Sequence, residues 1–325
     1  MILNFNGEKY LKNCLGSVLD LDMKDKEVIF VDNASTDNSL SFVERNYPGI
    51  SIIKNDKNEG YARGANIGIE KCKGDYVLII NPDIVFEPDY LKNLITRLHG
   101  DSKIGAIIGK LRKYDFEGKC KTNIMDSAGL EIYKNRRCVD RGQGAVDIGQ
   151  FDSPEEVFGI TGACPLYRKK ALDDCQVEGE FFDGDFFTYK EDVDLSWRMR
   201  LMGWKCFYEP SAVAYHCRGT GVVLREKILE VAANRKNLSK FQKFYSYKNE
   251  RLMRVKNDLA ANVSANLLSI VWKEVLMTGW MTFREPFLYK AFFAFIKQLP
   301  SALRKRKEIS RRKKVSAKEM QKWFV

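Results

Sequence analysis

The chain has 325 residues, of which 45% are hydrophobic and 12% aromatic, and it carries a formal net charge of +11. This length and composition indicate one large or two modest globular domains and exclude a disordered chain. Eight cysteines without a C-x-x-C pair indicate neither a zinc site nor a disulfide framework, so we expect a reducing, cytoplasmic setting.

The charge is divided unevenly along the chain. Residues 1–217 carry 29 Lys and Arg against 35 Asp and Glu, whereas residues 218–325 carry 25 against 8. The two parts therefore have net charges of −6 and +17. A basic part of this kind predicts contact with an anionic partner, either a membrane or a nucleic acid. No signal peptide is apparent at the start of the sequence.

The first hundred residues alternate between strand and helix patterns. We expect short buried strands near residues 2–5 and at 27–31, 50–53 and 77–80, with a helix over 8–20. Ser35 or Thr36 is expected to cap the helix after the second strand. This alternation predicts an α/β fold with a parallel, doubly wound sheet and right-handed crossovers. Because the first strand is short, we expect the natural start to lie upstream.

Two carboxylates directly follow predicted strands. Asp32 comes after the second strand, and Asp83 comes after Asn81 and Pro82, where proline ends the ladder. Ligands of open α/β sheets bind at this edge, so Asp83 is a candidate for holding a cation or a ligand hydroxyl. An Asx or proline turn that merely ends the strand is the alternative interpretation.

A glycine-rich stretch and a looser middle region follow. The glycines at 60, 64 and 68 fall four apart, which is not the dinucleotide fingerprint, and tight helix packing is their alternative explanation. We expect a strand at 104–108 and loops and hairpins over 112–156 on the acceptor side. A strand over 159–167 contains small residues that would let a substrate approach the backbone.

A second acidic patch lies at residues 181–198. Asp192, Leu195 and Met199 share the inward face of a predicted helix. A capping box from Thr188 to Glu191 would explain Glu191 alone. A carboxylate on an apolar face is costly unless it is used, so Asp192 is a candidate general base.

Two further features bear on this chemistry. The aromatic residues at 186, 187 and 189 are expected to form a wall that raises the pKa of Asp192. His216 ends a predicted strand at 212–216, where a structural role is the alternative. With an aspartate from a distant strand, it could complete a site for a hard metal ion whose other ligands are substrate oxygens.

Seven stretches, in order over residues 2–219, resemble the family 2 glycosyltransferases with a GT-A fold, particularly the rhamnosyltransferase-like members. The stretches are Asn4-Phe-Asn-Gly7, Val31-Asp-Asn-Ala-Ser-Thr-Asp-Asn-Ser39, Asn58-x-Gly-Tyr-Ala-x-Gly-x-Asn-x-Gly68, Asn81-Pro-Asp83, Gly162-Ala-Cys-Pro-Leu, Phe186-Phe-x-Tyr-x-Glu-Asp-Val-Asp-Leu195 and His216-x-x-Gly219.

This resemblance implies inverting transfer of a sugar, with dTDP-rhamnose as the expected donor, to a hydroxyl of a cell-surface or lipid-linked glycan. Asp192 would be the general base, and Asp83 with His216 would hold Mg²⁺ or Mn²⁺. Asp32 would accept a hydrogen bond from the pyrimidine N–H of a dTDP- or UDP-sugar. The remaining nucleotide-sugar residues would be Asn4, Asn33, Asn58, Gly60, Arg63, Asn66 and Asn81, and the acceptor-side or supporting residues would be Gly162, Ala163, Tyr189, Glu191 and Arg198.

Asn81 replaces the first acid of the D-x-D motif of that family, so this motif offers only one carboxylate to a metal. Two other functions stay open. A sugar-nucleotide pyrophosphorylase shares the sheet type, although a glycine-rich, basic N-terminal loop is missing. A non-catalytic adaptor would leave Asp32, Asp83 and Asp192 without a common purpose.

Residues 220–325 are predicted to form a second, helical region after a catalytic domain at 1–219. Helical patterns cover 224–257 and 263–299, and no uncharged run reaches the ~18 residues of a transmembrane helix. Eight of the eleven residues from 304 to 314 are basic. We expect peripheral attachment to the anionic inner face of the cell membrane. A helical subdomain with a solvated charged end is the alternative, and nucleic-acid binding is not expected because no recognised module is present.

Overall fold

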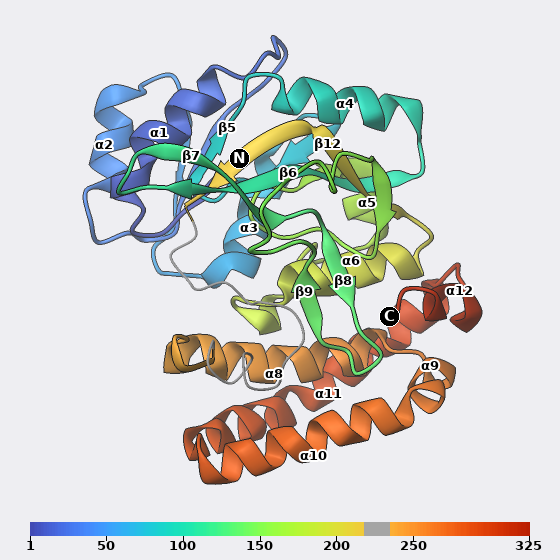
Figure 1. Ribbon diagram of the computed structural model, residues 1–325. Coiled ribbons are helices and arrows are strands. Elements are labelled where there is room, and N and C mark those ends of the chain that lie inside the picture. Colours follow the sequence, from blue (N-terminus) through green and yellow to red (C-terminus); the bar gives the residue numbers. More distant parts are fainter. Residues whose placement is uncertain (218–234) are drawn as a thin grey trace.

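The computed structural model describes residues 1–217 and 235–325. An α/β part with helices on both sides of its sheets lies above a layer formed by α8, α10 and α11 (Figure 1). Within that layer α10 lies farthest from the sheets (Figure 1). The core is continuous over most of the chain, because buried residues of α8 and α11 pack in the same cluster as those of the sheets.

The first three strands form a parallel sheet in the order β1-β2-β3, as the sequence predicts. Helices separate these strands, and the register places Asn4 opposite Asp32 at the C-terminal edge. The elements are β1 (Ile2–Asn4), α1 (Glu8–Leu19), β2 (Ile29–Asp32), α2 (Ser39–Asn46), β3 (Ser51–Lys54) and α3 (Gly60–Lys71).

The second sheet has seven strands and is mixed. Its order is β10-β12-β6-β11-β4, with β5 beside β12 and β7 beside β6. Only β6 and β12 are parallel, so the expectation of a mostly parallel sheet is wrong for this part. A short turn joins β6 to β7, and such a turn allows only antiparallel pairing. The strands are β4 (Tyr76–Leu78), β5 (Ile84–Phe86), β6 (Ile104–Asp115), β7 (Cys120–Ser127), β10 (Glu155–Val157), β11 (Leu166–Arg168) and β12 (Lys205–His216).

The other elements of this part are short or lie outside the sheet. The α/β fold with a helical extension is confirmed, but β6 runs seven residues beyond the predicted end at 108, and β11 covers only the end of the predicted strand at 159–167. The remaining elements are α4 (Tyr90–Gly100), β8 (Leu130–Ile132), β9 (Cys138–Asp140), α5 (Lys169–Asp174), the 3₁₀ turn η1 (Gly184–Phe186) and α6 (Glu191–Leu201).

The predicted cap of α2 is wrong. This helix begins at Ser39, and neither Ser35 nor Thr36 caps it. Ser35 Oγ instead accepts hydrogen bonds from Asn4 Nδ2 and from the backbone N of Asn6, both at 3.0 Å. The hydroxyl is therefore used to join the ends of β1 and β2.

Helices make up most of the C-terminal region that the structure describes, and Phe324 near its end forms a β-bridge with Ile132. The first helix of this region that we label, α8, begins at a capping box between Ser239 and Gln242. The predicted boundary at 219 and the predicted helical residues 224–234 lie outside the described residues. Among the described helices, none is both long enough and apolar enough to cross a membrane. The elements are α8 (Lys240–Asn257), α9 (Ala260–Ala265), α10 (Leu267–Phe283), η2 (Pro286–Leu288), α11 (Tyr289–Arg312) and α12 (Ala317–Gln321).

Part of the basic run at 304–314 pairs within the protein, although five of its eight basic residues are exposed. Lys305 is only 4% exposed and contacts Asp185 Oδ2 at 2.8 Å. Arg312 donates to the carbonyl of Asp174 at 2.5 Å, and Lys314 contacts the carboxylate of the same residue at 2.9 Å. The acidic α/β part and the basic helices have complementary charge, so the run pairs across their contact.

Candidate active site

Asp32 lies at the C-terminal end of β2, where its buried carboxylate is held by polar neighbours. Oδ1 accepts a hydrogen bond from Asn4 Nδ2 at 3.2 Å, and Oδ2 accepts one from the backbone N of Ser35 at 3.0 Å. Asn4 is itself fully buried, and its Oδ1 has no hydrogen-bond partner among the described residues. These contacts fix the carboxylate that the resemblance assigns to a pyrimidine base.

The loop before α3 is tied to β2 through Asn33. Its Nδ2 donates to Asn58 Oδ1 and to the Gly60 carbonyl, both at 3.0 Å, and its Oδ1 accepts from Asn55 Nδ2 at 3.0 Å. Gly60 has φ +74°, and a Cβ there would lie 2.4 Å from the carbonyl oxygen of Phe187. Glycine at this position therefore permits the close approach of the loop that precedes α6.

The other predicted residues of α3 lie in different surroundings. Gly64 faces β1, where an added Cβ would lie 2.8 Å from a leucine side chain, in agreement with the packing interpretation. The amide of Asn66 is buried and exchanges two hydrogen bonds of 2.8 Å with the backbone of Phe182. Arg63 is 54% exposed and lies 3.9 Å from Glu59. Arg63 is thus available to a ligand, whereas Asn66 is engaged within the fold.

His216 ends β12 and lies between two carboxylates. Its Nε2 is 3.3 Å from Asp83 Oδ2, and its Nδ1 is 2.8 Å from Asp126 Oδ2 on β7. Burial lowers the pKa of His216, but the two carboxylates outweigh it and raise this pKa to about 10. Burial raises the pKa of Asp83, and His216 brings it below its usual value. The structure thus brings both predicted metal residues together.

The Asp83 and His216 side chains fit the divalent cation that the resemblance implies. Two adjacent ligands, each about 2.1 Å from a metal, lie about 3 Å apart, close to the 3.3 Å between Nε2 and Oδ2. His216 Nε2 would lose its proton on metal binding, and the contact of Nδ1 with Asp126 would keep the remaining proton on Nδ1, so that the Nε2 lone pair faces the metal. Within residues 1–217 and 235–325 no cluster of three or more His, Cys, Asp and Glu forms a metal site, so substrate oxygens would have to complete it.

Asp192 lies in the first turn of α6 and faces a cavity of about 430 Å³. Its Oδ2 accepts a hydrogen bond from the backbone N of Gly162 at 2.9 Å, and its Oδ1 accepts one from that of Val193 at 2.8 Å. Tyr61 holds the same segment by donating to the Gly162 carbonyl at 2.7 Å. The cavity gathers predicted residues of the base, metal, nucleotide-sugar and acceptor-side sets: Asn81, Gly162, Ala163, Tyr189, Glu191, Asp192 and His216.

Glu191 and Asp192 are neighbouring carboxyl groups with different surroundings. Burial, followed by the charge of Asp192, raises the pKa of Glu191 well above its usual value. Burial also raises the pKa of Asp192, although Lys190 and two backbone N–H groups oppose the shift. Glu191 Oε2 is buried without a hydrogen-bond partner among the described residues. Of the two carboxyl groups, Asp192 is therefore the one with contacts that favour its charged form against the effect of burial.

One expectation about the approach to α6 is wrong and another holds in part. The residue before the helix is Lys190, with φ +73° and no side-chain cap, so Thr188 and Glu191 form no capping box. The ring of Phe187 stacks on Tyr245 of α8, with centroids 5.2 Å apart, whereas Tyr189 lines the cavity with Asp192, whose pKa burial raises as expected. The loop adopts left-handed turns because it is packed against α8.

Arg198 lies away from the acceptor side. Its guanidinium is 1% exposed and contacts Asp194 Oδ2 at 3.0 Å and the Phe181 carbonyl at 2.7 Å. Arg198 therefore supports the fold beneath the site. Asp126 is the residue that sequence reasoning missed, and its only sequence signal is a carboxylate near the end of a predicted hairpin strand.

The family model described as "Glycosyl transferase family 2" matches residues 1–176, which is more than half of the chain. The chain belongs to glycosyl transferase family 2. The match covers β1 through β11 and so includes the edge that carries Asp32 and Asp83. The rhamnosyltransferase-like subgroup is not distinguished by this match.

Curated relatives of this family 2 chain include poly-β-1,6-N-acetyl-D-glucosamine synthase of Staphylococcus aureus strain COL, 28% identical over 219 residues. That alignment covers 65% of this chain and 47% of the relative. The synthase of the same name from Staphylococcus epidermidis is 27% identical over 220 residues, with the same coverage. The chain thus spans about half the length of these relatives.

Solved structures with the same fold include S. aureus TarS 1–349 in complex with UDP, with a TM-score of 0.55 and 14% identity. The superposition covers 95% of this chain and 90% of that one. GalNAc-T7 with UDP, GalNAc and Mn²⁺ has a TM-score of 0.55 and 13% identity, covering 88% of this chain and 57% of the other. These likenesses show the GT-A fold.

Proposed function

We propose that this chain is an inverting glycosyltransferase that moves a sugar from a nucleotide diphosphate to a hydroxyl of a cell-surface or lipid-linked glycan. The observation that carries the proposal is that Asp192 and His216 line one cavity, and that Asp83 Oδ2 lies 3.3 Å from His216 Nε2. Asp192, as the proton acceptor, and His216, as a residue for the side of the leaving diphosphate, thus line the same cavity.

The chemistry requires both groups. As the acceptor hydroxyl oxygen bonds to the anomeric carbon, Asp192 takes its proton, and the bond to the nucleotide diphosphate breaks. Attack opposite the leaving group inverts the anomeric configuration without an enzymic nucleophile. Asp83 and His216 would hold Mg²⁺ or Mn²⁺, which would supply charge neutralisation for the departing diphosphate.

Asp192→Asn tests the base assignment, with the exposed Asp20→Asn as a matched control. We expect the Asp192 variant to lose turnover by about 10²- to 10⁴-fold while it still binds the nucleotide sugar. Retained turnover would refute the role of Asp192. Pyrophosphate among the products would instead identify a sugar-nucleotide pyrophosphorylase, and donor binding without turnover of any acceptor would favour an adaptor.

The donor is proposed to carry a pyrimidine base, because Asp32 offers a fixed carboxylate at the base position. The resemblance favours dTDP-rhamnose, whereas the names of the curated relatives and the TarS complex with UDP-GlcNAc favour an N-acetylglucosamine donor. A thermal-shift screen of dTDP-, UDP- and GDP-sugars, with and without Mn²⁺, separates them. Stabilisation by a GDP-sugar alone would contradict the role of Asp32.

We also propose that the outer face of α10 attaches the protein to the inner face of the cell membrane. Every exposed residue of this helix is uncharged, and both of its charged residues turn inward, Lys273 to Glu250 and Glu274 to Arg251 and Arg254 of α8. An exposed apolar face of this size marks an interaction site. Its large apolar residues are Leu267, Leu268, Val271, Trp272, Val275, Leu276 and Phe283.

Basic residues near the end of this face, Arg284 and Lys290, are exposed and complement anionic headgroups. We expect the full chain to co-sediment with vesicles containing anionic lipid and Trp272→Asp to weaken this binding. The eight free cysteines support a reducing compartment on that side. Equal sedimentation with and without lipid, or self-association of the chain on its own, would overturn the membrane proposal.

A further inference from the structure

The loop that delivers Asp192 to the cavity is strained. Phe187 has φ +64° and ψ −65°, Tyr189 has φ +68° and Lys190 has φ +73°, so three of the four residues before α6 are left-handed without being glycine. Each such conformation is unfavourable for a residue with a side chain and persists only where its surroundings impose it. The strain lies directly before the turn of α6 that carries Asp192, and some other element must therefore hold the loop.

Asn249 of α8 makes the contacts that do so. Its Nδ2 donates to the carbonyls of Phe186 at 2.9 Å, Thr188 at 2.8 Å and Tyr189 at 2.7 Å. Three carbonyls so close in sequence converge on one atom only because the backbone between them turns left-handed. An amide has two hydrogens, so the three acceptors share them. This residue is fully buried, as expected for a side chain that serves only the loop.

The orientation of the Asn249 amide is decided by its surroundings. Its Oδ1 has no hydrogen-bond partner in residues 1–217 and 235–325. Exchanging the oxygen and nitrogen would place the oxygen against three carbonyl oxygens, which is repulsive. The loop thus receives donors while one buried acceptor of the same side chain is left without a partner among the described residues, which is unfavourable by itself.

The opposite side of the loop is fixed as well. The Phe187 carbonyl accepts a hydrogen bond from the backbone N of Ala62 at 3.1 Å, at the start of α3. On the other side, Phe187 stacks on Tyr245 of α8. The loop therefore lies between the helix that begins the nucleotide-sugar cleft and the helix that carries Asn249.

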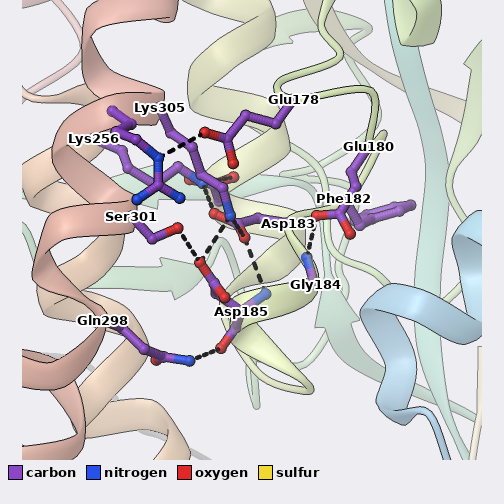
Figure 2. A network of polar contacts seen from close by, with 12 residues as sticks. Glu178, Glu180, Phe182, Asp183, Gly184, Asp185, Lys256, Gln298, Ser301 and Lys305 are labelled. Atoms are coloured by element: carbon purple, nitrogen blue, oxygen red, sulfur yellow. Dashed lines mark hydrogen bonds and ion pairs between the residues drawn. The ribbon is translucent and has the colours of Figure 1, made fainter.

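A second set of contacts holds the chain on the other side of Asp192. Asp194 is fully buried, and its carboxylate accepts from Lys256 Nζ at 2.9 Å and from Asn257 Nδ2 at 2.8 Å. Figure 2 shows the neighbouring network, in which Lys256 and Lys305 converge on Asp183 ahead of the loop. α8 thus holds the chain before, at and after the strained residues.

We propose that Asn249 is a positioning residue that sets the place of the Asp192 carboxylate by holding the left-handed loop before α6. This inference rests on the proposed role of Asp192 as the base. Asn249 touches no reacting atom. Its effect passes through the backbone from Phe186 to Tyr189 and then through Lys190 to the first turn of α6.

Asn249→Ala tests the proposal, with Met253→Ala as the matched control. Met253 is one turn further along α8 and equally buried. We expect Asn249→Ala to lower kcat about 10- to 100-fold relative to Met253→Ala, with the KM for the nucleotide sugar nearly unchanged. If the substitutions acted only by lowering stability, kcat would fall by a similar factor in both variants.

The pH profile gives a readout that a structural role would not move. The charged and titratable groups around Asp192 are Glu191 and Lys190 beside it and, elsewhere on the cavity lining, Tyr61, Cys138, Asp140, Tyr189 and His216. If Asn249→Ala lets the loop relax and water reach Asp192, the acid limb of kcat moves to lower pH. An acid limb equal to that of Met253→Ala, together with equal kcat, would overturn the proposal.

Lys190→Gly provides a rescue. Glycine accepts φ +73° without strain, so Asn249→Ala is expected to lower kcat less in a Lys190→Gly background than in the unsubstituted chain. Lys190→Gly alone is the reference, because it also removes the charge that lowers the pKa of Asp192. An equal loss of kcat in both backgrounds would contradict transmission through the loop. If Asn249→Ala does not fold, Asn249→Ser, which keeps one donor, replaces it in every comparison. Asp192→Asn is measured in parallel, because turnover in that variant would refute the role of Asp192 as the base. If Asp192→Asn is inactive but Asn249→Ala has the kcat of the unsubstituted chain, only the positioning role is refuted.

Discussion

His216 Nδ1 lies 2.8 Å from Asp126 Oδ2, which joins the last residue of β12 to the end of β7. A carboxylate behind a histidine fixes the ring and its tautomer, and its removal typically costs a metal site about 10- to 100-fold in affinity. We therefore expect Asp126→Asn to raise the Mn²⁺ concentration required for half-maximal turnover by about that factor. Asp115→Asn, on the exposed end of β6, serves as the control, and an equal Mn²⁺ requirement in the two variants would count against the relationship.

The pH dependence of turnover should report Asp192. Burial raises its pKa, and a base must be unprotonated to accept a proton, so kcat should fall as the pH falls through that raised pKa. The acid limb is expected to lie above the usual carboxyl range near about 4. A kcat profile measured at saturating donor and acceptor checks this, and an acid limb at or below that range would show that burial does not act on the base.

Glu191 should make stability depend on pH with a definite sign. Its folded pKa is raised above the unfolded value, so the folded state binds more protons, and stability falls as the pH rises above the unfolded pKa. Glu191→Gln removes this proton linkage while keeping the side-chain shape. We expect the melting temperature of Glu191→Gln, minus that of the unsubstituted chain, to increase as the pH is raised from about 4 toward 8. A constant difference would mean that Glu191 is not held protonated.

Gly60 should tolerate no side chain. Its φ of +74° costs an alanine about 1–2 kcal/mol, and the new Cβ would meet the Phe187 carbonyl oxygen at 2.4 Å. In denaturant unfolding, Gly60→Ala should lower the free energy of unfolding by more than this conformational cost. Turnover should fall as well, because Phe187 belongs to the loop before Asp192. Gly279→Ala, in α10 with open space around it, should instead gain about 0.5–1 kcal/mol. Equal effects of the two substitutions would contradict the contact.

Local patterns allowed the positions of several candidate residues to be predicted. The strand ends that carry Asp32, Asp83 and His216 follow from short apolar runs, and the mixed sheet then places Asp83 beside His216 through the pairing of β5 with β12. Asp126 could not be predicted, because its position depends on a β6–β7 register that contains two irregularities. Nothing in the sequence around residue 126 indicates which strand it will lie against.

The contact between the two parts was the least predictable feature. The basic run at 304–314 has the composition of a solvated or membrane-binding segment, and only the folded chain shows that Lys305 faces Asp183 and Asp185. Likewise, an asparagine within a charged helix pattern gives no sign that it binds carbonyls about sixty residues earlier. Such contacts depend on tertiary packing, which periodicity does not encode.

Asn249 and Glu250 are successive residues of α8, yet they contact different neighbours. Asn249 binds the loop before Asp192, whereas Glu250 pairs with Lys273 of α10. A shift or rotation of α8 would change both contacts together. Exchanging the C-terminal helices for those of another family member should therefore alter the turnover number even when every residue lining the cavity is kept, and an enzyme cut before α8 should not serve as a minimal catalyst.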